Sequence, residues 1–180
     1  KNSQRRAAQD FSYSLEQIKS LMNKIRSHPL HAIQDATQLI NFISNKLFHH
    51  NNITLHLISD LPNAETFYYH SLNVTTLSML IAKLSGKTIQ EINLLGIAAL
   101  FHDIGNMSIP SAIFRKPSYL SNPELNIFKL HPIYSVKLLN LSSSLKDEVK
   151  EIIAAQHERL DGTGYPKGLM GSDISELTQL

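Results

Sequence analysis

The spacing of apolar residues constrains this chain more than any other feature. Apolar side chains recur at helical intervals along almost the whole sequence, and no stretch shows sustained alternation with a period of two. The pattern predicts amphipathic helices over residues 14–26, 31–48 and 66–84, with a short helix over residues 53–58 between the last two. The expected fold class is therefore all-α.

Each of the three longer helices has one face that is expected to meet the core. In the first two helices these faces are formed by Leu15, Ile18, Met22 and Ile25, and by Ile33, Ile40, Ile43 and Leu47. In the third helix, the residues that share a face with His70 are Val74, Leu77, Ile81 and Leu84. Gly86 is placed to cap the third helix at its C-terminus.

Further helices follow, each with a recognisable start. Thr88 and Glu91 form a capping box, which opens a helix whose apolar stripe leads to His102 through Ile92, Leu95 and Ala99. Other starts are expected at Asn122-Pro123-Glu124, at the His131-Pro132 junction and between Ser144 and Asp147. The last of these helices should place Gln156 on a stripe with Val149, Ile152 and Ile153. A glycine-rich loop is expected after His157.

The length of 180 residues suits one core with a small helical appendage. The polar stretch after Leu47 predicts a boundary, so that residues 1–64 form an N-terminal helical segment and residues 65–180 form the main domain. The N-terminal segment carries no chemical signal and is expected to dock or to transmit a signal. Because the chain starts at Lys1 without Met, it is expected to be a piece of a longer protein.

Charge and composition narrow the classes of partner. Lys and Arg number 17 against 15 Asp and Glu, which gives a net charge of +2, and no basic stripe is present. Binding to polymeric nucleic acid is therefore not expected. No run approaches the roughly 18 apolar residues of a membrane span, and no signal peptide is evident, so a cytoplasmic location is expected. Cysteine is absent, so any metal must be bound by His, Asp, Glu or water.

Four of the nine histidines stand where a buried ligand would stand. His70, His102 and His157 each lie on or beside the apolar stripe of a different helix, and His131 lies at a helix junction. One such histidine is more often a hydrogen-bonded core residue, but four together favour a metal site. The adjacent pair His49 and His50 lies in a polar loop without a nearby carboxylate, and we expect it to be exposed and non-binding.

Asp103 strengthens the metal interpretation. A carboxylate near the C-terminus of a helix is unfavourable to the helix dipole and needs a compensating positive charge, which a metal ion would supply. Imidazole and carboxylate ligands without thiolate suit iron, manganese or zinc. Two such ions a few ångströms apart are a common arrangement for phosphoester hydrolysis.

These residues belong to an ordered series of motifs that resembles the HD-GYP domain, a branch of the HD phosphohydrolase superfamily. The resemblance covers residues 65–180. Its motifs are His102-Asp103-Ile104-Gly105-Asn106, Ile109-Pro110, Lys116-Pro117, His131-Pro132 and the run from His157 to Pro166 that ends in Gly164-Tyr165-Pro166.

The resemblance implies an all-helical HD-domain bundle that hydrolyses cyclic di-GMP through a metal-bound hydroxide. It implies two divalent ions, with iron or manganese favoured and zinc possible, held by His70, His102, Asp103, His131 and His157. His102 and Asp103 would be the catalytic centre. Substrate contacts would come from Asn106, Lys116, Gly164, Tyr165 and Pro166, and the loop of the last three is also the expected contact for a signalling protein.

Three departures from the family pattern leave the activity open. Gln156 stands where the family has a further histidine, Asn106 stands where it has a lysine, and a later metal-binding aspartate lies beyond Leu180, so that the domain is expected to be incomplete at its C-terminal end. One hypothesis is a cyclic di-GMP phosphodiesterase. The alternative is a degenerate HD-GYP domain that binds a nucleotide or a protein without hydrolysis. A third possibility is hydrolysis of a different phosphoester.

Overall fold

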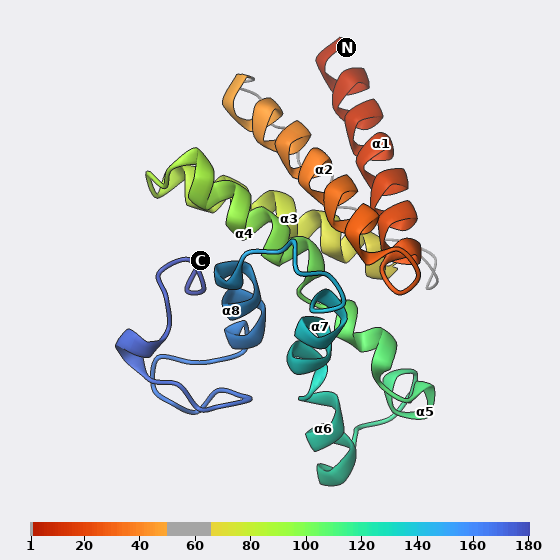
Figure 1. The fold of residues 1–180 in the computed structure, drawn as a ribbon, viewed down its shortest axis with the longest axis vertical. Coiled ribbons are helices and arrows are strands. Elements are labelled where there is room, and N and C mark those ends of the chain that lie inside the picture. Colours follow the sequence, from red (N-terminus) through yellow and green to blue (C-terminus); the bar gives the residue numbers. More distant parts are fainter. Residues whose placement is uncertain (1, 50–65) are drawn as a thin grey trace. The chain divides into compact units, whose positions relative to one another are not determined.

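The structure, a computed structural model, describes residues 2–49 and 66–180 (Figure 1). Within these ranges every regular element is a helix, and strand-like pairing is limited to an isolated bridge between Asp161 and Met170. The chain divides into two compact units, Lys1–Leu100 and Phe101–Leu180, which are described separately below. The all-α prediction is confirmed.

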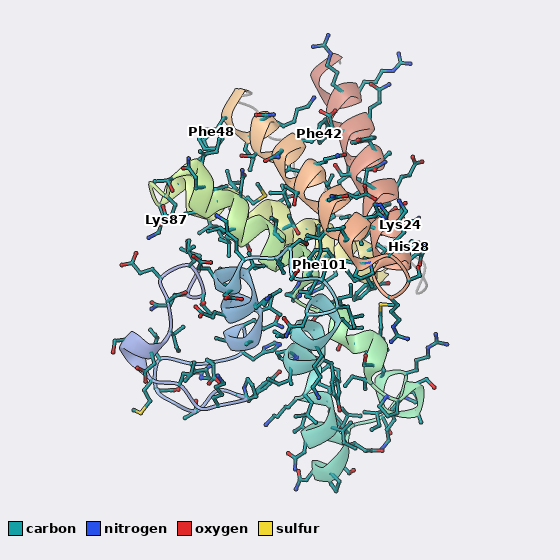
Figure 2. The ribbon with its side chains drawn as sticks, viewed as in Figure 1. Lys24, His28, Phe42, Phe48, Lys87 and Phe101 are labelled. Carbon is teal, nitrogen blue, oxygen red and sulfur yellow. The ribbon has the colours of Figure 1, made fainter. Side chains whose placement is uncertain are left out.

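The first unit begins with two long helices that pack side by side, α1 (Asn2–Lys24) and α2 (Pro29–His49), shown in red and orange in Figure 1. Their predicted core faces are confirmed, because the eight apolar residues expected there are all buried. An ion pair of 2.9 Å between Lys24 Nζ and Asp35 Oδ2 also joins the two helices, and Figure 2 shows Lys24 beside His28 at the turn between them.

The first helix starts earlier than its apolar stripe indicated. Residues 5–8 are Arg, Arg, Ala and Ala, which favour helix strongly without forming an apolar face. Phe11 then packs against Tyr69 of α3, with ring centroids 5.6 Å apart. An ion pair of 2.9 Å between Asp10 and Lys46 of α2 also holds this part of the helix. The additional turns of α1 therefore come from helix propensity and side-chain contacts, which a search for apolar periodicity does not detect.

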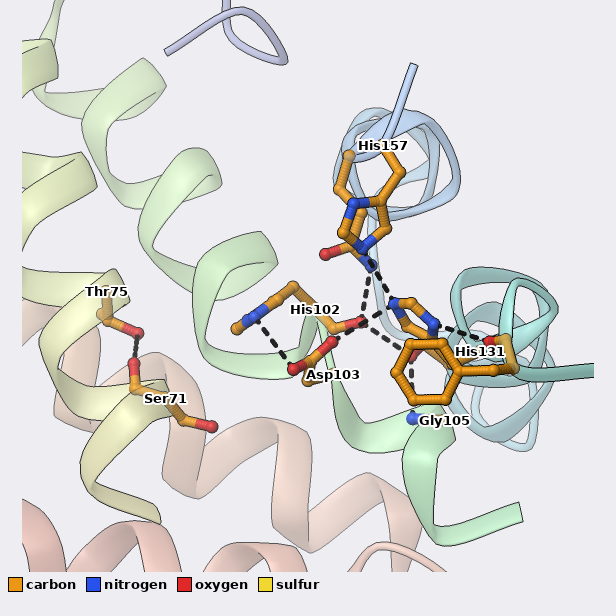
Figure 3. A network of polar contacts seen from close by, with 10 residues as sticks. Ser71, Thr75, His102, Asp103, Gly105, His131 and His157 are labelled. Carbon is orange, nitrogen blue, oxygen red and sulfur yellow. Dashed lines mark hydrogen bonds and ion pairs between the residues drawn. The ribbon is translucent and has the colours of Figure 1, made fainter. Parts of the chain in front are cut away.

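Helix α3 (Thr66–Leu84) has the predicted bounds, but the face predicted to be buried is wrong. The side chain of His70 is exposed, as are those of Ile81 and Leu84, and Leu84 is 78% exposed. The buried residues are instead Ser71, Leu72, Thr75, Met79 and Ala82. Thr75 is accepted there because its hydroxyl donates to the Ser71 carbonyl at 2.7 Å, so its burial costs no hydrogen bond (Figure 3).

The junction between α3 and α4 (Ile89–Phe101) follows the predicted capping signals. Gly86 has a positive φ of 73° and donates its backbone N–H to the Lys83 carbonyl, while Lys87 donates to the Ala82 carbonyl, which is a Schellman motif. The Glu91 carboxylate accepts hydrogen bonds of 2.7 Å from both the backbone N–H and the hydroxyl of Thr88. The buried stripe of Ile92, Leu95 and Ala99 is confirmed, and Phe101 at the end of α4 is fully buried (Figure 2).

The second unit consists of short helices. They are η1 (Ile104–Ser108), α5 (Ser111–Phe114), α6 (Asn122–Phe128), α7 (His131–Leu139), α8 (Asp147–Ala155) and η2 (Gly171–Asp173). Helix α7 packs against both η1 and α8 (Figure 1). The predicted starts at Asn122, His131 and Asp147 are confirmed, whereas η1, α5 and η2 are too short to have been expected.

Three sequence predictions fall wholly or partly on residues that the structure does not describe. The short helix predicted over residues 53–58 lies outside the described residues, and so does His50. For His49 the structure describes only its place at the end of α2. The proposed division into segments 1–64 and 65–180 also lies there and stays a prediction. Within residues 2–49 and 66–180, none of the helices combines the length and apolar character that crossing a membrane requires.

Candidate metal centre

Three side chains with metal-binding atoms converge in the second unit. Asp103, His131 and His157 each offer one such atom, and these atoms lie within 4.8 Å of one another. Asp103 follows the end of α4, His131 is the first residue of α7, and His157 comes just after α8 (Figure 3). The cluster therefore forms where three helices start or end, and the packing of α7 against η1 and α8 brings these ends together.

The carboxylate of Asp103 faces two different imidazoles. Its Oδ1 lies 3.3 Å from Nε2 of His131, and its Oδ2 lies 3.4 Å from Nε2 of His102. His131 in turn faces His157, with 3.0 Å between their Nε2 atoms (Figure 3). A carboxylate that presents one oxygen to each side is suited to bridge two cations.

The orientation of His131 is fixed by its other ring nitrogen. Nδ1 lies 2.9 Å from the backbone carbonyl of Phe128, and because a carbonyl can only accept, Nδ1 must carry the hydrogen. In the neutral ring, the lone pair is then on Nε2, which points into the cluster. A backbone carbonyl that holds the outer nitrogen of a ligand histidine is a common feature of metal sites. His131 is only 1% exposed, so this orientation is also fixed by packing.

His157 is kept in the form that can bind a metal. Burial lowers the pKa of its imidazole below the ordinary value of 6.5, and the neighbouring His131 lowers it further, against the opposing effect of Asp103. The ring is therefore neutral at pH 7. On one side it stacks with Tyr165, with 4.7 Å between ring centroids and 15° between ring planes.

The donor set fits a divalent cation. Nε2 of His131 lies 3.0 Å from Nε2 of His157 and 3.3 Å from Oδ1 of Asp103. When Nε2 of His157 carries no hydrogen, these atoms present only lone pairs to one another, and a cation bound among them would convert that repulsion into coordination. Two imidazoles and a carboxylate, without thiolate, are typical ligands of iron, manganese and zinc.

A glycine allows α7 to approach the turn that carries Asp103. A Cβ atom on Gly105 would overlap the backbone carbonyl oxygen of His131 and would lie 2.5 Å from the backbone nitrogen of Ser135. The Gly105 N–H donates to the Ser135 hydroxyl at 2.8 Å. The close contact between η1 and α7, and with it the position of His131 beside Asp103, therefore requires glycine here.

The Gly164-Tyr165-Pro166 loop is folded back onto the end of α8. The N–H of Tyr165 donates to the carbonyl of His157 at 3.1 Å, which places the tyrosine ring on the imidazole. A Cβ atom on Gly164 would lie 2.5 Å from the Cα of Glu158, so this position also requires glycine. Burial and the charge of Asp103 raise the pKa of the Tyr165 hydroxyl, so the group stays neutral.

The remaining predicted site residues have different surroundings. His70 lies on α3 in the first unit, with an exposed side chain, and its role as a ligand stays a prediction. Asn106 is buried, and its Oδ1 has no hydrogen-bond partner within the described chain. Lys116 forms an ion pair of 2.6 Å with Glu124. The substrate contacts assigned to Asn106, Lys116 and the loop stay predictions.

The roles of three residues near the cluster were not predicted from the sequence. Ser135 lies four residues after His131 on α7 and donates its hydroxyl hydrogen to the His102 carbonyl at 2.8 Å. Gln156 donates to the same carbonyl at 2.8 Å and does not belong to the cluster of potential ligands. The carboxylate of Glu158 accepts backbone N–H groups from Lys167 and Leu169 and so holds the loop. Only the helical spacing of Ser135 from His131 could have indicated one of these roles.

Comparison with known proteins identifies the family. A family model described as HD domain matches residues 19–180. A cyclic di-GMP phosphodiesterase of Pseudomonas aeruginosa is 33% identical over 145 residues, which are 81% of this chain and 35% of that protein. A cyclic di-GMP phosphodiesterase of Thermotoga maritima is 36% identical over 121 residues, or 67% of this chain and 33% of that protein. A 3′3′-cGAMP-specific phosphodiesterase of Vibrio cholerae is 40% identical over 95 residues, or 52% of this chain and 18% of that protein.

This chain thus spans about a third or less of the length of these relatives. The match to the family model covers most of the chain, including the region of every predicted motif. The chain therefore belongs to the HD domain family, as a member of the HD-GYP type.

Proposed function

We propose that this chain is the part of a cytoplasmic phosphodiesterase that binds metal ions and hydrolyses a cyclic dinucleotide, with cyclic di-GMP as the substrate. The observation that carries the proposal is the convergence of Asp103, His131 and His157, together with the Asp103 carboxylate that faces both His131 and His102. The relatives support the substrate class, since each is named as a phosphodiesterase of a cyclic dinucleotide.

The proposed metal ligands are Asp103, His102, His131 and His157, together with His70. They would hold two divalent ions, with iron or manganese favoured and zinc possible, because the set combines imidazole with carboxylate and lacks thiolate. Such ions, when bound, would activate water and neutralise the charge that develops on the scissile phosphate.

The chain itself prepares the ligands before any ion binds. The Phe128 carbonyl fixes the tautomer of His131, so that the lone pair of its Nε2 is directed into the cluster, and burial keeps His157 neutral at pH 7. Asp103 supplies the negative charge that balances part of the charge of the cations. A site that is organised in advance loses little free energy to ordering when its ligands close on a metal.

The substrate would lie beside the loop that carries Tyr165. The tyrosine ring stacks on His157, and the ammonium of Lys129 lies 5.3 Å above the tyrosine ring, which adds a positive charge near the metal cluster. Asn106 and Lys116 are proposed as further contacts to the substrate. The same loop is the proposed contact for a signalling protein partner.

A second function is favoured by one observation. The side chain of Gln156 is bonded to a backbone carbonyl and adds no ligand, so the site has fewer imidazoles than the family pattern provides. An HD-GYP domain with a weakened metal site could bind a nucleotide or a protein without hydrolysing it. This alternative predicts ligand binding in a protein that shows no turnover.

The two functions can be separated with the full-length protein that contains this chain. The protein is loaded with Mn²⁺ or Fe²⁺, its metal content is measured, and it is incubated with cyclic di-GMP and, separately, with 3′3′-cGAMP. We expect linear products from cyclic di-GMP, loss of turnover in Asp103→Asn, and normal turnover in Glu151→Gln, which alters an exposed residue of α8. Nucleotide binding without turnover by the metal-loaded protein would favour the alternative.

A further inference from the structure

One backbone carbonyl joins the three segments that carry the metal ligands of the second unit. The carbonyl oxygen of His102 accepts one hydrogen bond from the Ser135 hydroxyl and another from Nε2 of Gln156, each of 2.8 Å. Ser135 lies on α7, one helical turn after His131, and Gln156 directly precedes His157. Each donor therefore belongs to a residue close to a potential metal ligand, Ser135 to His131 along the surface of α7 and Gln156 to His157 in the sequence.

The two donors satisfy a group that would otherwise be costly to bury. His102 follows α4, where the last carbonyls have no partner within the helix. A carbonyl oxygen has two lone pairs, and here both are used. The Ser135 hydroxyl also accepts the N–H of Gly105 at 2.8 Å, so a continuous chain of hydrogen bonds runs through both sides of the turn that contains Asp103.

This arrangement fixes the relative positions of Asp103, His131 and His157. The distances between their metal-binding atoms depend on where three helix ends lie. The carbonyl of His102, at the end of α4, accepts hydrogen bonds from α7 and from the end of α8, and so connects all three. Small shifts matter, because ligands must be held to within about 0.5 Å of the geometry that a metal requires.

We propose that Gln156 and Ser135 are positioning residues, which hold the His102 carbonyl and thereby set the geometry of the metal ligands that they do not themselves join. The inference rests on the proposed function in so far as it assumes a metal site at Asp103, His131 and His157. It assigns to Gln156 a role of its own, which is to donate a hydrogen bond through its side-chain amide.

The test removes each donor separately and then both together. Gln156→Met keeps the length of the side chain and removes the donor, Ser135→Ala removes the hydroxyl, and Glu151→Gln on the exposed side of α8 is the matched control. The affinity of the full-length protein for Mn²⁺ is measured by calorimetry. The melting temperature without metal, and kcat and KM for cyclic di-GMP, are measured in parallel.

We expect each single substitution to weaken Mn²⁺ binding by about threefold to tenfold, which corresponds to the loss of one hydrogen bond. The double variant should lose more than the product of the two single effects, because only then is the carbonyl left without a donor. The loss of affinity should exceed what the change in melting temperature accounts for, and kcat should fall while KM changes little. Glu151→Gln should bind Mn²⁺ as the unaltered protein does.

Other outcomes separate the inference from the proposed function. Variants that bind Mn²⁺ with unchanged affinity, in a protein that hydrolyses cyclic di-GMP, would overturn the positioning role alone. A protein that binds Mn²⁺, loses affinity in the variants as expected and hydrolyses nothing would retain the positioning role and contradict the proposed function. A protein that binds no Mn²⁺ would overturn both.

Discussion

At the scale of single residues, the centre depends on the absence of a side chain at Gly105. A Cβ atom there would overlap the His131 carbonyl and crowd the backbone of Ser135, and backbone atoms cannot move aside without separating η1 from α7. We expect Gly105→Ala to lower the free energy of unfolding by about 2–3 kcal/mol, within the range for overpacking in a tight site. Urea unfolding measures this change.

Gly171→Ala is the matched control for this prediction. Nothing lies within 4 Å of a Cβ atom at Gly171, so the cost there comes only from its positive φ of 45° and should be about 1 kcal/mol. Equal losses in the two variants would contradict a steric requirement at Gly105.

Tyr165 acts on the centre through its ring. The ring stacks on His157 and packs edge-on against His131, with 4.7 and 6.4 Å between the respective ring centroids. Tyr165→Leu should weaken metal binding by about 0.5–1.5 kcal/mol, the range for an aromatic pair. Tyr165→Phe keeps the ring and should bind Mn²⁺ normally in the same calorimetric assay. A loss of affinity in the Phe variant would instead assign the effect to the hydroxyl.

At the scale of elements, α6 begins with a charged cap that should be visible in the pH dependence of stability. The ammonium of Lys116, the N–H of Ser121 and the Ser121 hydroxyl, in that order, lower the pKa of the Glu124 carboxyl from 4.5 to about 2. A carboxyl with a lowered folded-state pKa stabilises the fold above pH 4.5, and this stabilisation disappears as the pH falls from 4.5 towards 2.

The prediction compares the unaltered protein with Glu124→Gln in chemical unfolding between pH 2 and 7. We expect the variant to be less stable at neutral pH, because it loses the ion pair with Lys116. The stabilities of the two proteins should converge as the pH falls towards about 2, where half of the folded molecules carry a protonated Glu124. A difference that stays constant down to pH 2 would show that the carboxylate charge is not the cause.

Signals of different kinds explain which elements could be predicted from the sequence. The capping box at Thr88 and the glycine at Gly86 act through hydrogen bonds within a few residues, so their positions were correct. The buried face of α3 depends on which neighbouring helices it meets, and Thr75 is buried there because its hydroxyl bonds within the helix. Apolar periodicity favoured Ile81 and Leu84 instead, and both are exposed.

At the scale of the whole molecule, the potential ligands could be predicted from the sequence, but the residues that hold them in position could not. His157 was predicted as a ligand from its place beside an apolar stripe, His131 from a helix junction and Asp103 from the end of a helix, and the structure brings their ligand atoms within 4.8 Å of one another. The contributions of Ser135 and Gln156 arise only when α7 and α8 meet the turn after α4, and this depends on tertiary contacts between residues more than 30 positions apart in sequence. No local pattern encodes such a contact.

The metal site should stabilise the fold by linkage. An ion that binds only the folded protein contributes about 2.7 kcal/mol when its free concentration is 100 times the dissociation constant. At about 2–4 °C per kcal/mol, Mn²⁺ should raise the melting temperature by roughly 5–10 °C, and a chelator should reverse the rise. Differential scanning fluorimetry with and without Mn²⁺ measures this shift.

Two histidine variants locate the ion that causes the shift. His131→Gln removes the buried imidazole of the cluster, whereas His28→Gln removes an exposed imidazole at the turn between α1 and α2. Each variant is compared with itself, with and without Mn²⁺, so a change in intrinsic stability does not affect the result. The shift should disappear in His131→Gln and persist in His28→Gln. If His131→Gln keeps the full shift, the stabilising ion binds elsewhere, because the cluster cannot hold it without the Nε2 atom that faces both Asp103 and His157.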